Sequence, residues 1–208
     1  MRVRIPLWVA AALVWPLIAT AAELPIDDFK TGPEVSFLFS GNDLGLQAGS
    51  MVGGFRRTNF IVVPPAVPHP GLFHIPAGGP LIVSCGYKVG HRLELIYGVD
   101  GSGGGAPLNF DLSAYDRLVV DFDASDAGVN FNIVVYWASG AYWAIQGFNL
   151  AASNVPFSVS FPFASFTPGV PMIPPDWSDI DYIVVIAQTG SAIGSNDYAI
   201  KAFKAVGP

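Results

Sequence analysis

Side chains able to stack on a ligand or hydrogen-bond to it recur at alternate positions in several segments of the chain. Along 130–137, amides and an aromatic ring alternate with Phe131, Ile133 and Val135. Successive strand residues point to opposite faces, so one face would be apolar and the other would gather the polar and aromatic groups. The residues predicted to line this second face are Arg92, Glu94, Asp121, Asn132, Tyr136 and Trp143.

This combination of residue types is suited to a sugar. An aromatic ring can stack on the apolar face of a pyranose, while carboxylate, amide and guanidinium groups hydrogen-bond its hydroxyls. Trp177 is a further candidate, because Asp176-Trp-Ser178 follows a proline turn that would place the indole at the rim. The structural alternative is that Tyr136 and Trp143 form a cross-strand pair that only strengthens a hairpin.

Two other classes of function stay open beside non-catalytic binding. Glu94 and Asp121 would be the acid and base of a glycosidase if they were neighbours. No nucleophile-elbow pattern is present, and the glycine-rich loop 101–105 lacks the Lys-Ser/Thr of a phosphate-binding loop. We therefore predict no catalytic residues. The second class is an envelope or surface assembly protein, which the 51% hydrophobic composition favours.

The elements that must position these residues are short strands. Glycine (23 residues) and proline (18 residues) break the chain into short runs, and no helical periodicity is sustained. We predict a single all-β domain, a two-sheet antiparallel β-sandwich (jelly roll) over residues 23–208. The predicted strands are 26–30, 35–39, 56–63, 81–85, 92–97, 118–122, 131–137, 142–148, 157–162, 182–188 and 198–204.

One turn fixes a register that can be tested. The four residues 138–141 read Ala-Ser-Gly-Ala, which favours a tight hairpin. With Ser139-Gly140 at its tip, Trp137 would face Tyr142 and Tyr136 would face Trp143. Directly opposed residues share a face, so Trp137 would be in the core and Trp143 outside it.

The first 22 residues have the pattern of a secretory signal peptide. A basic start, an apolar run from Ile5 to Ile18 and the small residues Ala19-Thr-Ala21 precede the mature chain. We expect a secreted, periplasmic or cell-surface protein without membrane insertion after processing. The formal charge of −6, which becomes more negative when Arg2 and Arg4 are removed, disfavours nucleic acid as a partner. The predicted partners are a carbohydrate or glycan, or a protein in an envelope assembly.

Four short motifs resemble those of a known superfamily. They are Ile26-Asp-Asp-Phe29, Gly53-Gly-Phe-Arg56, Asp111-Leu-Ser-Ala-Tyr115 and Asp197-Tyr-Ala-Ile200. Together they resemble the landmarks of galactose-binding-like β-jelly-rolls, which include carbohydrate-binding modules such as family eleven and the complex I intermediate-associated proteins. The resemblance implies a two-sheet jelly roll and, commonly, sugar binding on a concave face.

The same resemblance implies a structural calcium ion near the joined chain ends. No cofactor is required by any motif, but Asp27, Asp28 and Asp197 would supply oxygen ligands if the first and last strands pair. The alternative is that an aspartate at a strand end only caps a turn.

Overall fold

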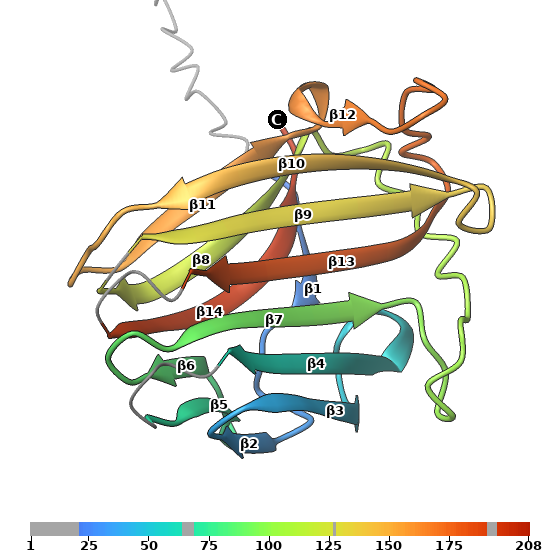
Figure 1. The fold of residues 1–208 in the computed structure, drawn as a ribbon. Helices are drawn as coiled ribbons and strands as arrows, with labels where there is room; N and C mark the ends of the chain where they lie inside the picture. The colour runs from blue at the N-terminus through green and yellow to red at the C-terminus, as the bar shows by residue number, and fades with distance from the viewer. Residues whose placement is uncertain (1–20, 64–68, 127, 191–194) are drawn as a thin grey trace, which may run out of the picture.

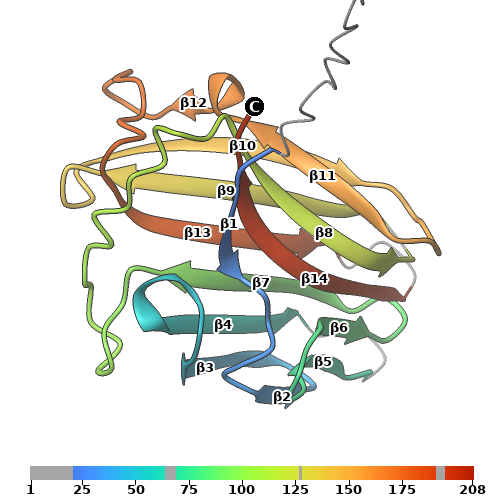
Figure 2. The same ribbon diagram turned by 180° about the vertical axis from the view of Figure 1, so that it is seen from behind.

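The protein is a sandwich of two antiparallel sheets, as predicted. The computed structural model describes residues 21–63, 69–126, 128–190 and 195–208. Figure 1 views the molecule from the side of one sheet, and Figure 2 views it from the side of the other. We call these sheet B and sheet A, respectively.

Sheet A runs in the order β11-β8-β14-β6-β5-β2, and β1 also pairs with β14. Its strands are β1 (Glu23–Asp27), β2 (Glu34–Leu38), β5 (Gly71–Ile75), β6 (Leu81–Cys85), β8 (Arg117–Ser125), β11 (Phe157–Pro162) and β14 (Asn196–Val206). Sheet B runs in the order β12-β10-β9-β13-β7-β4-β3. Its strands are β3 (Gly41–Ala48), β4 (Phe55–Val63), β7 (Gly90–Tyr97), β9 (Val129–Trp137), β10 (Tyr142–Leu150), β12 (Thr167–Pro168) and β13 (Ile180–Thr189). Two short 3-10 turns, η1 (Val52–Gly54) and η2 (Phe163–Ser165), complete the described elements.

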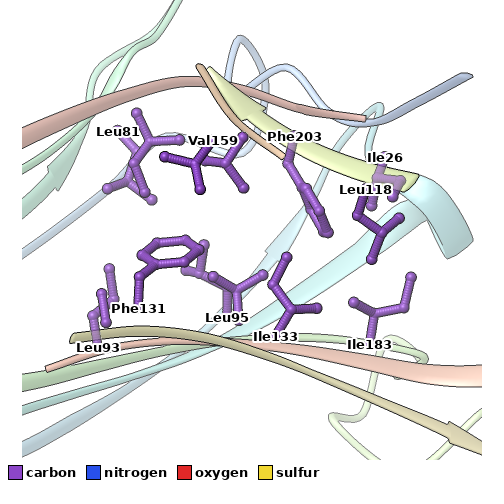
Figure 3. Packing of buried hydrophobic residues seen from close by; sticks show 14 of the residues in the cluster. Ile26, Leu81, Leu93, Leu95, Leu118, Phe131, Ile133, Val159, Ile183 and Phe203 are labelled. Carbon is purple, nitrogen blue, oxygen red and sulfur yellow. The ribbon is translucent and has the colours of Figure 1, made fainter. Parts of the chain in front are cut away.

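The core lies between the sheets. Figure 3 shows Leu81, Val159 and Phe203 of sheet A facing Phe131 and Ile133 of sheet B, and all five side chains are at most 5% exposed. Every second residue of the long strands points inward, which is why the buried and exposed positions alternate along β4, β7, β9 and β13. This alternation is the pattern from which the strands were predicted.

The predicted strands are all present, and the structure adds three more. The first strand runs from Glu23 to Asp27 rather than from Ile26 to Lys30, so its bounds were three residues too late. The strands missed were β3, β5 and the two-residue β12. β3 reads Gly-Asn-Asp-Leu-Gly-Leu-Gln-Ala and lies at the edge of sheet B, so only one neighbour selects for its side chains and its apolar signal is weak.

The hairpin between β9 and β10 has the predicted register. Trp137 pairs with Tyr142 and Tyr136 pairs with Trp143. The turn residues Ala138 and Ser139 have φ of 53° and 55°, a region that side chains rarely adopt. The Asp181 carboxylate accepts a hydrogen bond of 2.6 Å from the Ser139 backbone N–H, which holds the turn against the first residues of β13.

A buried ion pair links the two sheets at the start of the domain. Arg56 of β4 donates to Asp27 of β1 at 2.6 Å, and their side chains are 0% and 2% exposed. The hydroxyl of Tyr97 donates to the same carboxylate at 2.9 Å. Burial and the neighbouring Asp27 raise the pKa of Tyr97 well above its ordinary value, so the phenol keeps the proton that it donates.

Most of the predicted signal segment lies outside the described residues, as does the start of the proline-rich stretch at 64–68. The described chain includes Ala22, whose carbonyl accepts a hydrogen bond of 2.7 Å from Gly207. Within the described ranges, no helix is long and apolar enough to cross a bilayer.

Candidate functional site

The outer face of sheet B carries its side chains in rows that cross the strands. Strand pairing aligns Tyr182 with Tyr136 and Tyr136 with Trp143, which forms an aromatic row across β13, β9 and β10. Two residues further along the strands, an aliphatic row follows. Its members are Ile96, Val184, Val134 and Ile145. Polar rows come next, toward the opposite end of the strands.

The polar rows form one hydrogen-bonded chain over five strands, which we call the polar network. It consists of Asn59 (β4), Arg92 and Glu94 (β7), Gln188 (β13), Asn130 and Asn132 (β9) and Asn149 (β10). Glu94 lies at its centre: it accepts from Asn59 at 3.0 Å and from Arg92 at 2.7 Å. Arg92 also donates to Gln188 at 3.2 Å. The network therefore fixes a row of amide and guanidinium groups on the surface of the sheet.

The amide groups continue this chain across β9. Asn130 accepts from Asn132 at 2.6 Å and donates to Asn149 at 3.0 Å. Gly147 lies opposite Asn132, and a Cβ atom there would come within 2.5 Å of the Asn132 amide oxygen. The absence of a side chain at this glycine lets the Asn132 amide lie directly against the backbone of β10.

A hollow of about 440 Å³ lies at the polar end of this face. Its lining includes Arg92, Gln188 and Asn130 of the network together with Ile61 and His91. The His91 ring points into the core, where it contacts the Tyr198 hydroxyl and Thr189. Burial lowers the pKa of His91 to about 4, so Arg92 is the cation of this hollow at neutral pH.

The aromatic row forms the other end of the face. The Tyr136 and Tyr182 rings meet edge to face with centroids 6.4 Å apart, and Trp143 is 41% exposed. A Cβ at Gly169 would lie 2.3 Å from the Trp143 indole, so the glycine backbone packs directly on that ring. Burial, with a smaller effect of the Glu94 charge, raises the pKa of Tyr136, which keeps its hydroxyl protonated. One end of the face thus offers rings and the other offers polar groups.

Five of the predicted ligand-binding residues share this face, and Asp121 does not. Arg92, Glu94, Asn132, Tyr136 and Trp143 all point outward from sheet B. Asp121 belongs to β8 of sheet A, where it contacts Lys204 at 3.1 Å and Ser158 at 2.6 Å. Its grouping with the other five was wrong, because alternation sorts the residues of one strand and does not tell which sheet the strand joins. The suggested catalytic pair of Glu94 and Asp121 is therefore split between the sheets.

Trp177 lies in the loop before β13 and is not a member of the aromatic row. Its ring stacks on Phe163 with centroids 3.7 Å apart and meets Phe166 edge to face at 5.2 Å. The half-buried indole therefore packs against the turn η2 and the residue that follows it. Its role as a ligand-binding residue stays a prediction.

The three predicted calcium ligands do not converge. Both oxygens of Asp27 are occupied, by Arg56, Tyr97 and the Phe29 backbone. Asp28 accepts from the Lys30 backbone, as the turn-capping alternative expected. Asp197 pairs with Ser84, whereas Asp27 pairs with Phe203 further along β14. No cluster of three metal-ligating side chains occurs in the described part of the chain. Calcium binding itself stays a prediction.

Some members of the site were not among the predicted residues. Asn59, Asn130, Gln188 and Tyr182 belong to strands that were predicted, and each lies at an outward position of its strand. The signal was therefore present as alternation. What the sequence lacked was the strand order, which places β13 between β9 and β7.

Searches with the sequence matched no family model and no curated protein. Solved structures with a similar outline include the family 11 carbohydrate-binding module of the cellulosomal cellulase Lic26A-Cel5E of Clostridium thermocellum. That match has 14% identity and a TM-score of 0.47, and it covers 91% of this chain and 97% of that one.

Two other matches are to enzymes. The agarase AgWH50C matches with 13% identity and a TM-score of 0.46, over 89% of this chain and 24% of that one. The family 11 xylanase from Neocallimastix patriciarum matches with 10% identity and a TM-score of 0.41, over 82% and 98%. All three TM-scores are below 0.5, so the fold rests on the strands and pairings described above.

Proposed function

We propose that this protein is an exported, non-catalytic glycan-binding module whose ligand lies on the outer face of sheet B. The observation that carries the proposal is the combination of an aromatic row with a continuous polar network on one sheet face. Rings provide stacking surface, and fixed amide, carboxylate and guanidinium groups provide hydrogen bonds to hydroxyls. A sheet face that only contacts solvent does not require polar side chains that are hydrogen-bonded to one another across five strands.

The charges of the network favour a neutral sugar. Arg92, the cation beside the hollow, is paired with Glu94 at 2.6 Å, and the remaining network members are uncharged amides. The chain as a whole carries a net charge of −6, which disfavours anionic polymers. We therefore assign a neutral, hydroxyl-rich polysaccharide or oligosaccharide as the ligand class.

One observation favours the second candidate, an envelope or surface assembly protein. The edge strand β2 exposes 66% of Val35 and 58% of Phe37, and Phe39 beside it is 51% exposed. Apolar side chains on an unpaired sheet edge are a feature of surfaces that pair with another protein. This edge belongs to sheet A, so the two candidates use different parts of the molecule.

A glycan array with the processed protein tests the proposal. We expect binding to a subset of neutral glycans, and at least a tenfold loss of affinity in Trp143→Ala and in Asn132→Ala. Asp179→Asn, which changes an exposed acid outside the polar network and the aromatic row, is the matched control and should bind as the parent does. Absence of glycan binding by the folded parent, or unchanged binding by both site variants, would reject the proposal.

A further inference from the structure

A second hollow, on the outer face of sheet A, is distinct from the proposed glycan site. It has a volume of about 660 Å³ and lies over β6, β14 and the end of β8. Ala124, Ala199 and Ile82 are in register across the three strands and line its floor. Ser84, which pairs with Asp197, lies beside them. The volume is within the range of sites for small molecules.

The chain after β10 runs beside the end of β8 and lines one side of the hollow. Ser153 exchanges two backbone hydrogen bonds with Ser125, at 2.6 and 2.9 Å. This bridge places Ala152 and Asn154 beside the end of β8, where both residues line the hollow. The hollow is therefore built from segments held by backbone pairing.

Two carboxylates lie at the side of the hollow, and each has a free oxygen. Asp126 accepts from the Asp197 backbone N–H at 2.6 Å, and Asp197 accepts from the Cys85 backbone N–H at 3.1 Å. In both cases the Oδ1 atom is the acceptor. Among the described residues, neither Oδ2 atom has a hydrogen-bond partner, and no Lys or Arg lines the hollow.

A row of outward-facing residues, apolar except for His74, continues from the floor toward the sheet edge. Strand pairing aligns Ala199 with Ile82, Ile82 with His74, and His74 with the exposed Val35. A ligand with its charged end at the carboxylates could thus extend an apolar body along this row. The negative charge of Asp126 and Asp197 has no cation beside it in the lining of this hollow. In the polar network, by contrast, Arg92 balances the charge of Glu94.

We propose that this hollow binds a small amphiphilic cation, namely an apolar body that ends in a primary ammonium group. The apolar floor removes the body of such a ligand from water. The two unpartnered oxygens accept hydrogen bonds from the ammonium group, and the positive charge of the ligand complements the negative charges of Asp126 and Asp197.

Isothermal titration calorimetry with three matched probes tests this site. The probes are 4-phenylbutylammonium, 4-phenylbutanol and 4-phenylbutyrate, which share an apolar body and differ in the charge of the end group. We expect the ammonium compound to bind at least about tenfold more tightly than the alcohol, since a charge-assisted hydrogen bond is involved, and the carboxylate to bind most weakly.

Variants locate the binding. Asp126→Asn and Asp197→Asn keep an oxygen that can accept the backbone hydrogen bond, and either should remove the preference for the ammonium probe. Ala199→Leu fills the floor and should abolish binding of all three probes. Asp179→Asn removes one negative charge elsewhere and should change nothing. A melting curve for each variant shows that it is folded.

Equal affinity for the ammonium compound and the alcohol would overturn the proposal, as would no binding by the parent or undiminished binding by a folded Ala199→Leu variant. Trp143→Ala, on the other sheet, should bind the ammonium probe as the parent does. The failure of one site is therefore separable from the failure of the other.

Discussion

The same strands form both faces of sheet B, but the inner face packs against sheet A and the outer face carries the proposed ligand site. In the β9–β10 hairpin, Trp137 is 4% exposed and lies in the core, whereas Trp143 is 41% exposed and lies on the outer face. The inner face is mainly apolar, with Arg56, Thr58 and His91 as buried polar exceptions, and the outer face is divided into aromatic, aliphatic and polar rows. A tryptophan in this hairpin thus lies in the core or on the outer surface according to which face of the sheet its position points to.

Loss of the inner tryptophan should have the largest effect. Trp137→Ala leaves a cavity among well-packed residues, including Tyr142 with its ring 5.9 Å away. We expect the free energy of unfolding to fall by about 3–5 kcal/mol. Urea denaturation of the parent and the variant measures this difference. A loss below about 1 kcal/mol would mean that the hairpin does not contribute Trp137 to the core.

The ion pair inside the sandwich provides a second inner-face test. Asp27→Asn leaves the Arg56 charge buried without a counter-charge, and the cost should be about 3 kcal/mol or more. The double variant Asp27→Asn/Arg56→Met removes both charges and should recover part of that loss. A double-mutant cycle by urea denaturation measures the coupling. No recovery in the double variant would contradict the assignment of the cost to an unpaired charge.

His91 should make the inner face sensitive to acid. Burial lowers its folded pKa to about 4, compared with about 6.5 in the unfolded chain. Between these values the unfolded state binds more protons, so this contribution to stability is complete above the unfolded pKa and is lost as the pH falls toward 4.

His91→Phe retains the aromatic packing and removes the titration. The unfolding free energy of the parent minus that of the variant should therefore fall by roughly 3 kcal/mol between pH 7 and pH 4. Denaturation curves at a series of pH values measure this difference. A difference that stays constant with pH would show that His91 has the same pKa in the folded and the unfolded chain, and would contradict the effect of burial.

Loss of the outer tryptophan should have the smallest effect on stability. Trp143→Ala removes a half-exposed ring and opens no core cavity, so we expect a loss within about 1–2 kcal/mol. The same denaturation series measures it beside Trp137→Ala. If Trp143→Ala is as destabilising as Trp137→Ala, the aromatic row is structural and the division between the two faces fails.

The local features were predictable from the sequence because they depend on neighbours in the chain. The hairpin register follows from the turn 138–141, and the inward position of Phe131, Ile133 and Val135 follows from alternation. The weak pattern of β3 shows the limit of this approach, since an edge strand needs fewer apolar residues.

The site needed information that one strand does not contain. Asp121 occupies an outward position of its strand, as Glu94 does of its own, but β8 belongs to sheet A and β7 belongs to sheet B. Gln188 completes the polar network only because β13 lies between β7 and β9. Asp27 was expected to bind calcium, yet a buried arginine distant in the sequence occupies its carboxylate. Strand order and long-range pairing decided each of these cases.

The most direct test of the central claim is a titration of the isotopically labelled protein with a neutral oligosaccharide that the array identifies, followed by amide and side-chain chemical shifts. We predict that the largest shifts occur at the Trp143 indole, Tyr136, Asn132 and the Arg92 guanidinium, while core positions such as Ile133 change little. Shifts confined to β2 or to sheet A, or no saturable shift with any glycan on the array, would contradict the assignment of the outer face of sheet B as the glycan-binding site.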